Sequence, residues 1–174
     1  MHNTVYEAVA KFVETLDSQK TLLIADIGAQ SINGNLRSLF DKPQWTYHGI
    51  DRQKDDNIDI EVGSETDRWN IEDNTYDVIV SVSTLEHTEF PWLVVAQMAR
   101  ILKPGGVGCI TAPYAWPQHG WPLDCWRIFP DGMKAVLRYN GLTSDKVYTE
   151  KYTEPGLTEH CGDTIAIFSK SHAN

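Results

Sequence analysis

The chain has 174 residues, of which 41% are hydrophobic and 22% charged, so we expect one globular domain over residues 1–174 with a full core. Its formal net charge of −9 disfavours non-specific binding to nucleic acid or to an anionic membrane, because both attract basic surfaces. The sequence shows neither a signal-peptide core nor an apolar run of membrane-spanning length, which favours a cytoplasmic protein without membrane insertion. Cys109, Cys125 and Cys161 lack paired spacing, and we expect reduced thiols.

Segments with helical apolar spacing alternate with the short apolar runs that are typical of buried parallel strands. Asn33 or Ser31 is the expected N-cap of the second helix. Pro91 suits the first turn of the third helix, and residues 103–106 (Lys-Pro-Gly-Gly) are its expected stop. Helices are predicted at 4–17, 33–40, 90–102 and 130–139, and strands at 21–27, 45–51, 58–62, 76–82, 107–111, 143–150 and 164–169.

This alternation predicts an α/β fold with a Rossmann-like, doubly wound sheet. We expect about seven mostly parallel strands, with an antiparallel hairpin at the C-terminus. In such sheets, ligands bind beyond the carboxyl ends of the strands, at the topological switch point. The residues that follow each strand are therefore the first candidates for a site.

The first predicted strand ends in an acid that is closely followed by a glycine, Asp26-Ile27-Gly28. The carboxylate can bind a cationic or hydroxylic ligand group, and a glycine lets the backbone approach a ligand closely. The next glycine is Gly34, so the dinucleotide fingerprint G-x-G-x-x-G is absent and a dehydrogenase is disfavoured. An ordinary Asp-x-Gly turn without a ligand is the alternative.

The second predicted strand ends in Asp51-Arg52. A carboxylate at this position suits the two hydroxyl groups of a ribose, because it accepts both protons in one plane. Asp26 and Asp51 together are more specific than either acid alone. Arg52 either stacks on a base or is simply solvated.

The fourth predicted strand and its surroundings carry a family resemblance. Residues 76–79 (Tyr-Asp-Val-Ile) open the strand, residues 85–87 (Leu-Glu-His) follow it, and residues 100–106 (Arg-Ile-Leu-Lys-Pro-Gly-Gly) end the next helix. With the two strand ends above, this order resembles class I S-adenosylmethionine-dependent methyltransferases of the type 11-like kind, over at least residues 21–113. The resemblance implies S-adenosylmethionine as cofactor and methyl transfer as activity.

Two parts of the cofactor pocket follow from this resemblance. Asp26-x-Gly28 looks like the first motif of the family, and Asp51 looks like its ribose-binding acid. The family usually carries further glycines in the first motif. We therefore expect a cofactor loop of a different shape, in which Gln30 or the Asn33-Gly34 step faces the methionine moiety.

The acid that faces adenine in this family is expected between the third and fourth strands. Asp67 is the predicted residue, with Trp69 or Asn70 beside it, although a loop residue or a helix cap would have the same sequence context. The predicted cofactor-binding residues are Asp26, Gly28, Ala29, Gln30, Asp51, Arg52, Asp67 and Ser83.

The segment after the fifth predicted strand is rich in proline and aromatic residues. His119, Pro122, Asp124, Trp126 and Arg127 form a His-x-x-Pro-x-Asp-x-Trp-Arg element. This element is similar to one in a bacterial methyltransferase subgroup that is often encoded near glycan-assembly genes. The resemblance implies a small or glycan-type acceptor, and we expect methylation at oxygen.

An alcohol acceptor must lose a proton, and an imidazole is a base of suitable pKa. His119 is the first candidate base and His87 the second, while Asp124 is expected to orient His119 or to bind substrate. Each histidine is as readily a structural residue. The predicted acceptor-binding residues are Glu86, Trp116, Trp126 and Arg127.

The acceptor segment has structural alternatives as well. Trp116, Trp121 and Trp126 would serve equally to cover a sheet edge, and Arg127 would serve to pair with Asp124 or Glu86. We expect no metal. The candidate zinc ligands are His119, Cys125, His160 and Cys161, and their spacing matches no common zinc site.

Two other functions remain open at this stage. A catalytically inactive S-adenosylmethionine-binding module of the same fold is favoured by the glycine-poor first motif. A nucleic-acid methyltransferase is disfavoured by the acidic charge. The sequence leaves open whether copies of the chain assemble into a homo-oligomer that completes the acceptor side.

Overall fold

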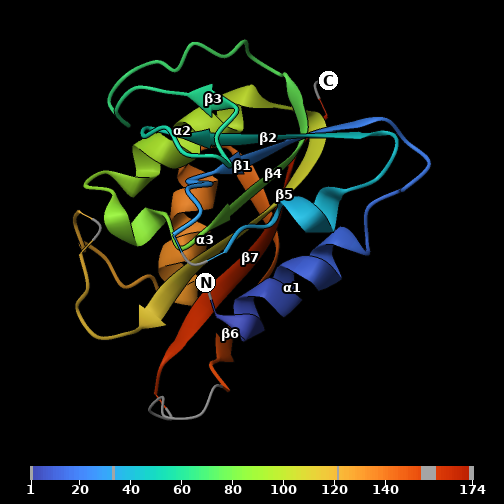
Figure 1. Cartoon of the computed structure of the whole chain (residues 1–174). Coiled ribbons are helices and arrows are strands. Elements are labelled where there is room, and N and C mark those ends of the chain that lie inside the picture. Colours follow the sequence, from blue (N-terminus) through green and yellow to red (C-terminus); the bar gives the residue numbers. More distant parts are fainter. Residues whose placement is uncertain (1, 33, 121, 154–159, 173–174) are drawn as a thin grey trace.

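Within the described residues, seven strands form one sheet in the order β3-β2-β1-β4-β5-β7-β6 (Figure 1). The computed structural model describes residues 2–32, 34–120, 122–153 and 160–172. β7 runs antiparallel to β5 and β6, and the other pairings are parallel, which confirms the predicted doubly wound sheet and C-terminal hairpin. The strands are β1 (Leu22–Ile27), β2 (Trp45–Asp51), β3 (Ile60–Glu61), β4 (Tyr76–Val82), β5 (Leu102–Ala115), β6 (Leu142–Lys151) and β7 (Gly162–Lys170).

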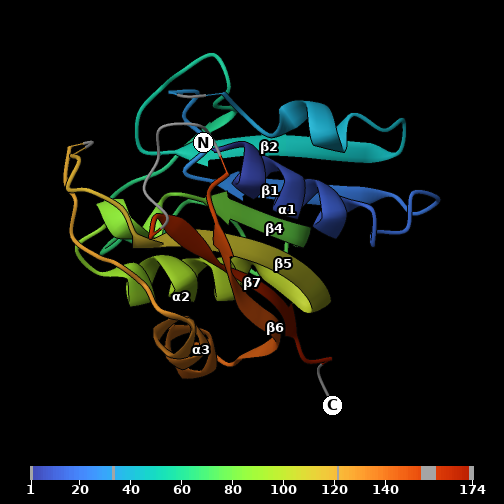
Figure 2. The same ribbon diagram turned by 90° about the horizontal axis from the view of Figure 1, so that it is seen from below.

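Helices cover both faces of the sheet (Figure 2). One core layer lies between the sheet and the helices α1 and η1. The other lies on the opposite face, between the sheet and the helices α2 and α3. No described helix has the length and apolar character that a membrane span requires. The helices are α1 (Asn3–Val13), α2 (Pro91–Ile101) and α3 (Pro130–Tyr139), with the short 3₁₀ helices η1 (Arg37–Phe40) and η2 (Leu85–His87).

The helix predicted at 33–40 is wrong, because only the 3₁₀ turn η1 forms there. Gly34 has φ +92°, in the left-handed region, which a right-handed helix cannot include. Ser31 Oγ is 3.3 Å from Asn35 Nδ2 and accepts its hydrogen bond, so it caps no helix. Asn33, the other predicted cap, lies outside the described residues.

The third helix ends near its predicted stop, but the stop residues form no loop. β5 begins at Leu102, directly after α2, and residues 103–106 already belong to the strand. Leu102 pairs with Tyr76, and the register then shifts before Val78 pairs with Val107. The Lys-Pro-Gly-Gly stretch is thus an irregularity at the start of a long strand.

The sheet has its topological switch point between β1 and β4. From β1 the chain adds β2 and β3 on one side, whereas β4 and β5 lie on the other side. The connections on the two sides diverge at this point, and the carboxyl ends of β1, β2 and β4 surround it. This is the place where an open α/β sheet binds its ligand.

Candidate functional site

A cavity of about 340 Å³ opens at the carboxyl ends of β1, β2 and β4. Its size falls within the usual range for small-molecule sites. The wall combines apolar side chains with carboxylates from several strand ends. The predicted cofactor-binding residues that line it are Asp26, Gly28, Ala29, Gln30, Asp51, Arg52 and Ser83.

Gly28 is required by its protein neighbours as well as by any ligand. It has φ +79°, and a Cβ at this position would lie 2.1 Å from Thr84 Oγ1. The Thr84 hydroxyl in turn donates a hydrogen bond to the Ile27 carbonyl at 3.1 Å. The loop after β4 therefore occupies the space that the missing side chain leaves, which sequence reasoning had assigned to ligand approach alone.

Asp26 is a buried acid at the end of β1. The Tyr47 hydroxyl donates a hydrogen bond to Asp26 Oδ2 at 2.5 Å. Burial, with a smaller contribution from the charge of Asp51, raises the pKa of Asp26 to about 7 against the lowering effect of the Tyr47 hydrogen bond. A ligand cation beside Asp26 would favour its carboxylate form, so the group is suited to a positively charged ligand.

A polar network supports the glycine-poor loop from the outside. Asn57 Nδ2 donates to the Ala29 carbonyl at 2.7 Å. Arg37 Nε in turn donates to Asn57 Oδ1 at 2.9 Å, and Arg37 Nη2 donates to Asp59 Oδ2 at 2.6 Å. These side chains hold the backbone of the loop after β1 in place, and no spacing rule in the sequence indicated them.

Asp51 and Arg52 lie at the cavity wall as predicted, but their partners differ. Asp51 Oδ1 accepts hydrogen bonds from the Arg52 and Gln53 amides at 2.6 and 3.1 Å, which orients the carboxylate. Arg52 Nη1 forms an ion pair with Glu65 Oε2 at 3.1 Å. Glu65 is a buried cavity residue that the sequence did not reveal, and its Oε1 accepts the Glu89 amide at 3.2 Å.

Asp67, the predicted adenine-facing acid, does not line the cavity. Its carboxylate accepts the Ser64 amide at 2.9 Å, so it closes a turn. Trp69 does line the cavity and donates through Nε1 to the Ser64 carbonyl at 3.3 Å. The acid beside Trp69 at the wall is therefore Glu65 rather than Asp67.

Arg127 fastens the loop that carries His119. Its guanidinium donates to both oxygens of Asp124 at 2.6 and 2.8 Å, and to the carbonyls of Trp116, Trp126 and Pro117 at 2.7 to 3.0 Å. These contacts use all five N–H groups of an arginine. Arg127 thus forms the alternative pair with Asp124 and does not line the cavity, so its role in acceptor binding stays a prediction.

Asp124 is the buried centre of the same loop. The Arg127 guanidinium holds the pKa of the Asp124 carboxyl well below its usual range. Oδ2 also accepts the His119 amide at 2.7 Å and lies 3.6 Å from His119 Nδ1. Asp124 does not line the cavity, and its contacts with His119 are those expected of a residue that orients this histidine.

The two described tryptophans of the loop stand outside the cavity wall. Trp116 packs edge-on against Tyr152, with ring centroids 5.3 Å apart. Trp126 packs against Trp92 at 6.0 Å, and its Nε1 donates to the Thr88 carbonyl at 3.0 Å. Neither of these two predicted acceptor-binding residues lines the cavity, and Trp121 lies outside the described residues.

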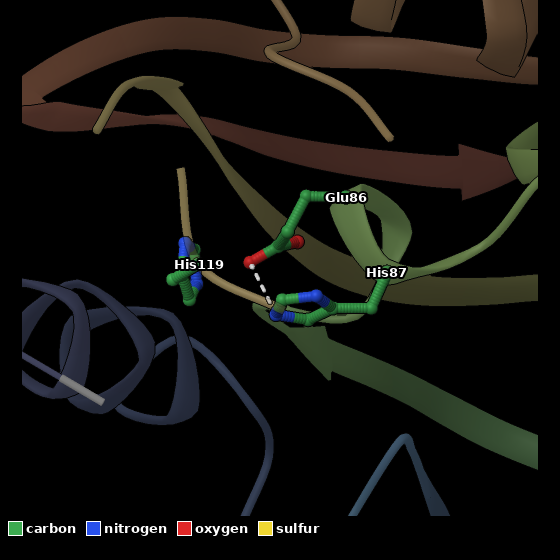
Figure 3. Close-up of side chains that lie close together, drawn as sticks. All are labelled: Glu86, His87 and His119. Carbon is green, nitrogen blue, oxygen red and sulfur yellow. Dashed lines mark ion pairs between the residues drawn. The ribbon is translucent and has the colours of Figure 1, made fainter. Parts of the chain in front are cut away.

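Glu86 and His87 on η2 meet His119 from the loop after β5 (Figure 3). One carboxylate oxygen and one nitrogen of each imidazole all lie within 4.8 Å of one another. Both histidines line the cavity, whereas Glu86 is 1% exposed and does not. Burial raises the pKa of Glu86 to about 8, and its Oε2 has no hydrogen-bond partner among the described residues.

The tautomer of each imidazole follows from its neighbours. His87 Nδ1 lies 2.6 Å from the Leu123 carbonyl, and His119 Nδ1 lies 3.2 Å from the Pro117 carbonyl. A carbonyl only accepts, so Nδ1 carries the proton in each neutral ring. Nε2 of each ring therefore keeps its lone pair.

The zinc set considered from the sequence does not assemble in the part of the chain that the structure describes. His119 groups with Glu86 and His87, and neither cysteines nor His160 join it. Burial raises the pKa of the Cys109 thiol to about 12, which makes it an inert core residue.

Comparisons with known proteins agree with this arrangement. A family model described as a methyltransferase domain matches residues 34–110. A search of curated protein sequences finds no match.

Several solved structures share the fold at low identity. A chain from the complex of the Haloferax volcanii Trm112 methyltransferase activator has a TM-score of 0.71 and 17% identity, over 99% of this chain and 92% of that chain. The [4+2]-cyclase SpnF has a TM-score of 0.71 and 15% identity, over 96% and 82%. Phosphoethanolamine N-methyltransferase 2 from Haemonchus contortus, solved with S-adenosyl-L-methionine, has a TM-score of 0.68 and 13% identity, over 97% and 52%. The chain therefore has the fold of class I S-adenosylmethionine-dependent methyltransferases, and its residues 34–110 match the methyltransferase domain family.

Proposed function

We propose that the chain is an S-adenosylmethionine-dependent methyltransferase that methylates an oxygen atom of a small or glycan-type acceptor. The observation that carries the proposal is the row of three acids, Asp26, Asp51 and Glu65, along one cavity at the switch point. The strand order of the sheet and the match of residues 34–110 to the methyltransferase domain model agree with this proposal.

The cavity residues fit this cofactor. The buried Asp26, whose pKa is raised to about 7, suits the ammonium group of the methionine moiety. Asp51, with Oδ1 held by two backbone amides, presents its carboxylate to the ribose hydroxyls. Glu65 and Trp69 form the wall that we assign to adenine. S-adenosylmethionine supplies an activated methyl group when bound.

The acceptor end of the cavity is formed by the two histidines. The lone pair on Nε2 of His87 or His119 is suited to accept the proton of an acceptor hydroxyl. Asp124 and Arg127 hold the His119 loop in place through their bidentate pair. The chain's own contribution to the reaction is thus to orient the acceptor and to receive its proton.

Calorimetric titration tests the cofactor assignment. S-adenosylmethionine should bind, NAD should not, and Asp51→Asn should weaken binding at least tenfold, because a carboxylate that accepts two hydroxyl protons becomes an amide. Asp131→Asn is the matched control, since the Asp131 side chain is 96% exposed on α3. Binding of NAD instead, or equal affinity of Asp51→Asn and the wild type, would refute the assignment.

The alternative is a module that binds S-adenosylmethionine without methyl transfer. Its supports are the single early glycine of the first motif and the fact that a cyclase, SpnF, has this fold. Transfer of a labelled methyl group to any hydroxyl acceptor in a panel of sugars and small alcohols favours the enzyme. Cofactor binding without transfer across the panel favours the module.

We further propose a cytoplasmic location, because the spacing of the three cysteines favours reduced thiols, and no nucleic-acid substrate, because the net charge is −9. Retention on immobilised RNA at physiological salt would contradict the second statement.

A further inference from the structure

We propose that Glu86, His87 and His119 bind a divalent transition-metal cation at the acceptor end of the cavity (Figure 3). Two imidazoles and one carboxylate are a donor set that suits Zn²⁺, Fe²⁺ or Co²⁺, whereas Mg²⁺ and Ca²⁺ prefer oxygen ligands alone. In Figure 3 the Glu86 carboxylate extends from η2 towards His119, with the His87 ring beside it.

The distances allow a shared cation after a small adjustment. His87 Nε2 lies 3.8 Å from Glu86 Oε1, and no pair of the three donor atoms is more than 4.8 Å apart. Ligand atoms about 2.1 Å from a tetrahedral cation lie roughly 3.4 Å from one another. The three donor atoms must therefore approach one another by roughly 1 Å on binding. The His119 side chain has room to turn, because it is 40% exposed.

The hydrogen bonds around the histidines are those of metal ligands. A metal-binding histidine usually donates its second ring N–H to a carbonyl or carboxylate, which fixes the tautomer. His87 donates to the Leu123 carbonyl, and His119 donates towards the Pro117 carbonyl with Asp124 Oδ2 at 3.6 Å. Both rings thus direct the proton away from Nε2, the nitrogen that binds a metal.

Glu86 supplies an independent reason. A buried carboxyl group is normally hydrogen-bonded, paired or bound to a metal, because an unpaired one is costly. Glu86 is buried, and its Oε2 lacks a hydrogen-bond partner within the described residues. Arg127 is the nearby fixed cation, but its five N–H groups are already used within the loop. The Glu86 oxygen nearest to His87 is Oε1, 3.8 Å from His87 Nε2, so a cation at the triad would balance the charge of the buried carboxylate through Oε1.

The role of this cation rests on the proposed function. Three protein ligands leave coordination positions for an acceptor oxygen at the cavity wall that His87 and His119 line. A cation lowers the pKa of a hydroxyl that binds to it, and the hydroxyl proton then passes to solvent water. With the metal bound, the imidazole lone pairs are used as ligands and the cation takes over activation of the hydroxyl.

Cobalt titration of the full chain, stripped with a chelator, tests the site without S-adenosylmethionine. We expect one Co²⁺ per chain with visible d–d absorption, displacement by Zn²⁺, and no effect of a large excess of Mg²⁺. Glu86→Gln, His87→Asn and His119→Ala should each weaken Co²⁺ binding at least tenfold. His172→Ala is the control, because the His172 ring lies against Gly105 at the start of β5 and should not affect binding.

Absence of stoichiometric Co²⁺ binding by the wild type would overturn the proposal, as would unchanged affinity in His119→Ala. The latter variant decides the matter if a change at buried Glu86 impairs folding, since the His119 side chain is partly exposed. Loss of S-adenosylmethionine binding would refute the proposed function and leave the cobalt result standing, so the two failures are distinguishable.

Discussion

Asp26 should make the stability of this protein depend on pH. Its pKa is raised from 3.8 to about 7, mainly by burial, so the native state binds the proton more tightly than the unfolded chain does. The stabilisation that this proton provides is complete below pH 4 and is lost as the pH rises to 7. Asp26→Asn removes the titration and keeps an oxygen that accepts the Tyr47 hydroxyl.

The magnitude follows from the shift. One pKa unit corresponds to about 1.4 kcal/mol, so the wild type should lose roughly 2–3 kcal/mol relative to Asp26→Asn between pH 5 and pH 8. Urea denaturation of both proteins at the two pH values measures this difference. Asp131→Asn, at a 96% exposed side chain, should follow the wild type at both pH values.

Parallel stability curves for the wild type and Asp26→Asn would refute the reasoning. The same group should also report on the ligand. If the ammonium group of S-adenosylmethionine lies at Asp26, binding near pH 6.5 releases a proton, which calorimetry in buffers of different ionisation enthalpy detects. Asp26→Asn should abolish this release.

Four further substitutions probe the scaffold and the chemistry. Gly28→Ala should destabilise the fold by about 3 kcal/mol, because φ is +79° and the new Cβ meets Thr84 Oγ1. Gly34→Ala should destabilise it by only about 1 kcal/mol through backbone strain, because the new Cβ meets nothing within 4 Å. Arg127→Lys should loosen the acceptor loop, raising amide exchange over residues 116–127 and the KM for acceptor, because lysine cannot form the bidentate pair. His119→Ala should lower turnover by about 10²- to 10⁴-fold and leave cofactor affinity within about twofold.

Each of these outcomes has a result that would contradict it. Equal destabilisation by Gly28→Ala and Gly34→Ala would show that the Thr84 contact is unimportant. Unchanged amide exchange over residues 116–127 in Arg127→Lys would show that Arg127 does not hold the acceptor loop in place. Unchanged turnover in His119→Ala would exclude His119 both as base and as metal ligand for the reaction.

Sequence patterns predicted the bounds of three elements best. β2 (Trp45–Asp51), β4 (Tyr76–Val82) and α3 (Pro130–Tyr139) have the bounds that the apolar runs and the turn residues indicated. The helix at 33–40 failed because its apolar positions, Leu36 and Phe40, pack against the sheet face from a 3₁₀ turn. A short segment buries two such side chains without needing a regular helix.

The candidate site likewise has residues that the sequence indicated and residues that it did not indicate. Asp26 and Asp51 were predictable, because an acid that ends a parallel strand must lie at the ligand edge of the sheet. The sequence did not indicate that Glu65 rather than Asp67 lines the cavity, because both occupy an irregular segment where side-chain direction has no period. The partner of Arg127 was among the alternatives, but nothing local showed that all its donors are used.

By itself, the sequence determined the fold class, the Asp26-Ile27-Gly28 turn and the acids at the strand ends. Periodicity and turn residues suffice for these features, since they act over a few neighbouring positions. Only the tertiary structure decided that Thr84 fills the space over Gly28, that Asn57 supports the first loop, and that His119 meets Glu86. These contacts join residues that are far apart along the chain, and their geometry depends on the packing of the whole sheet.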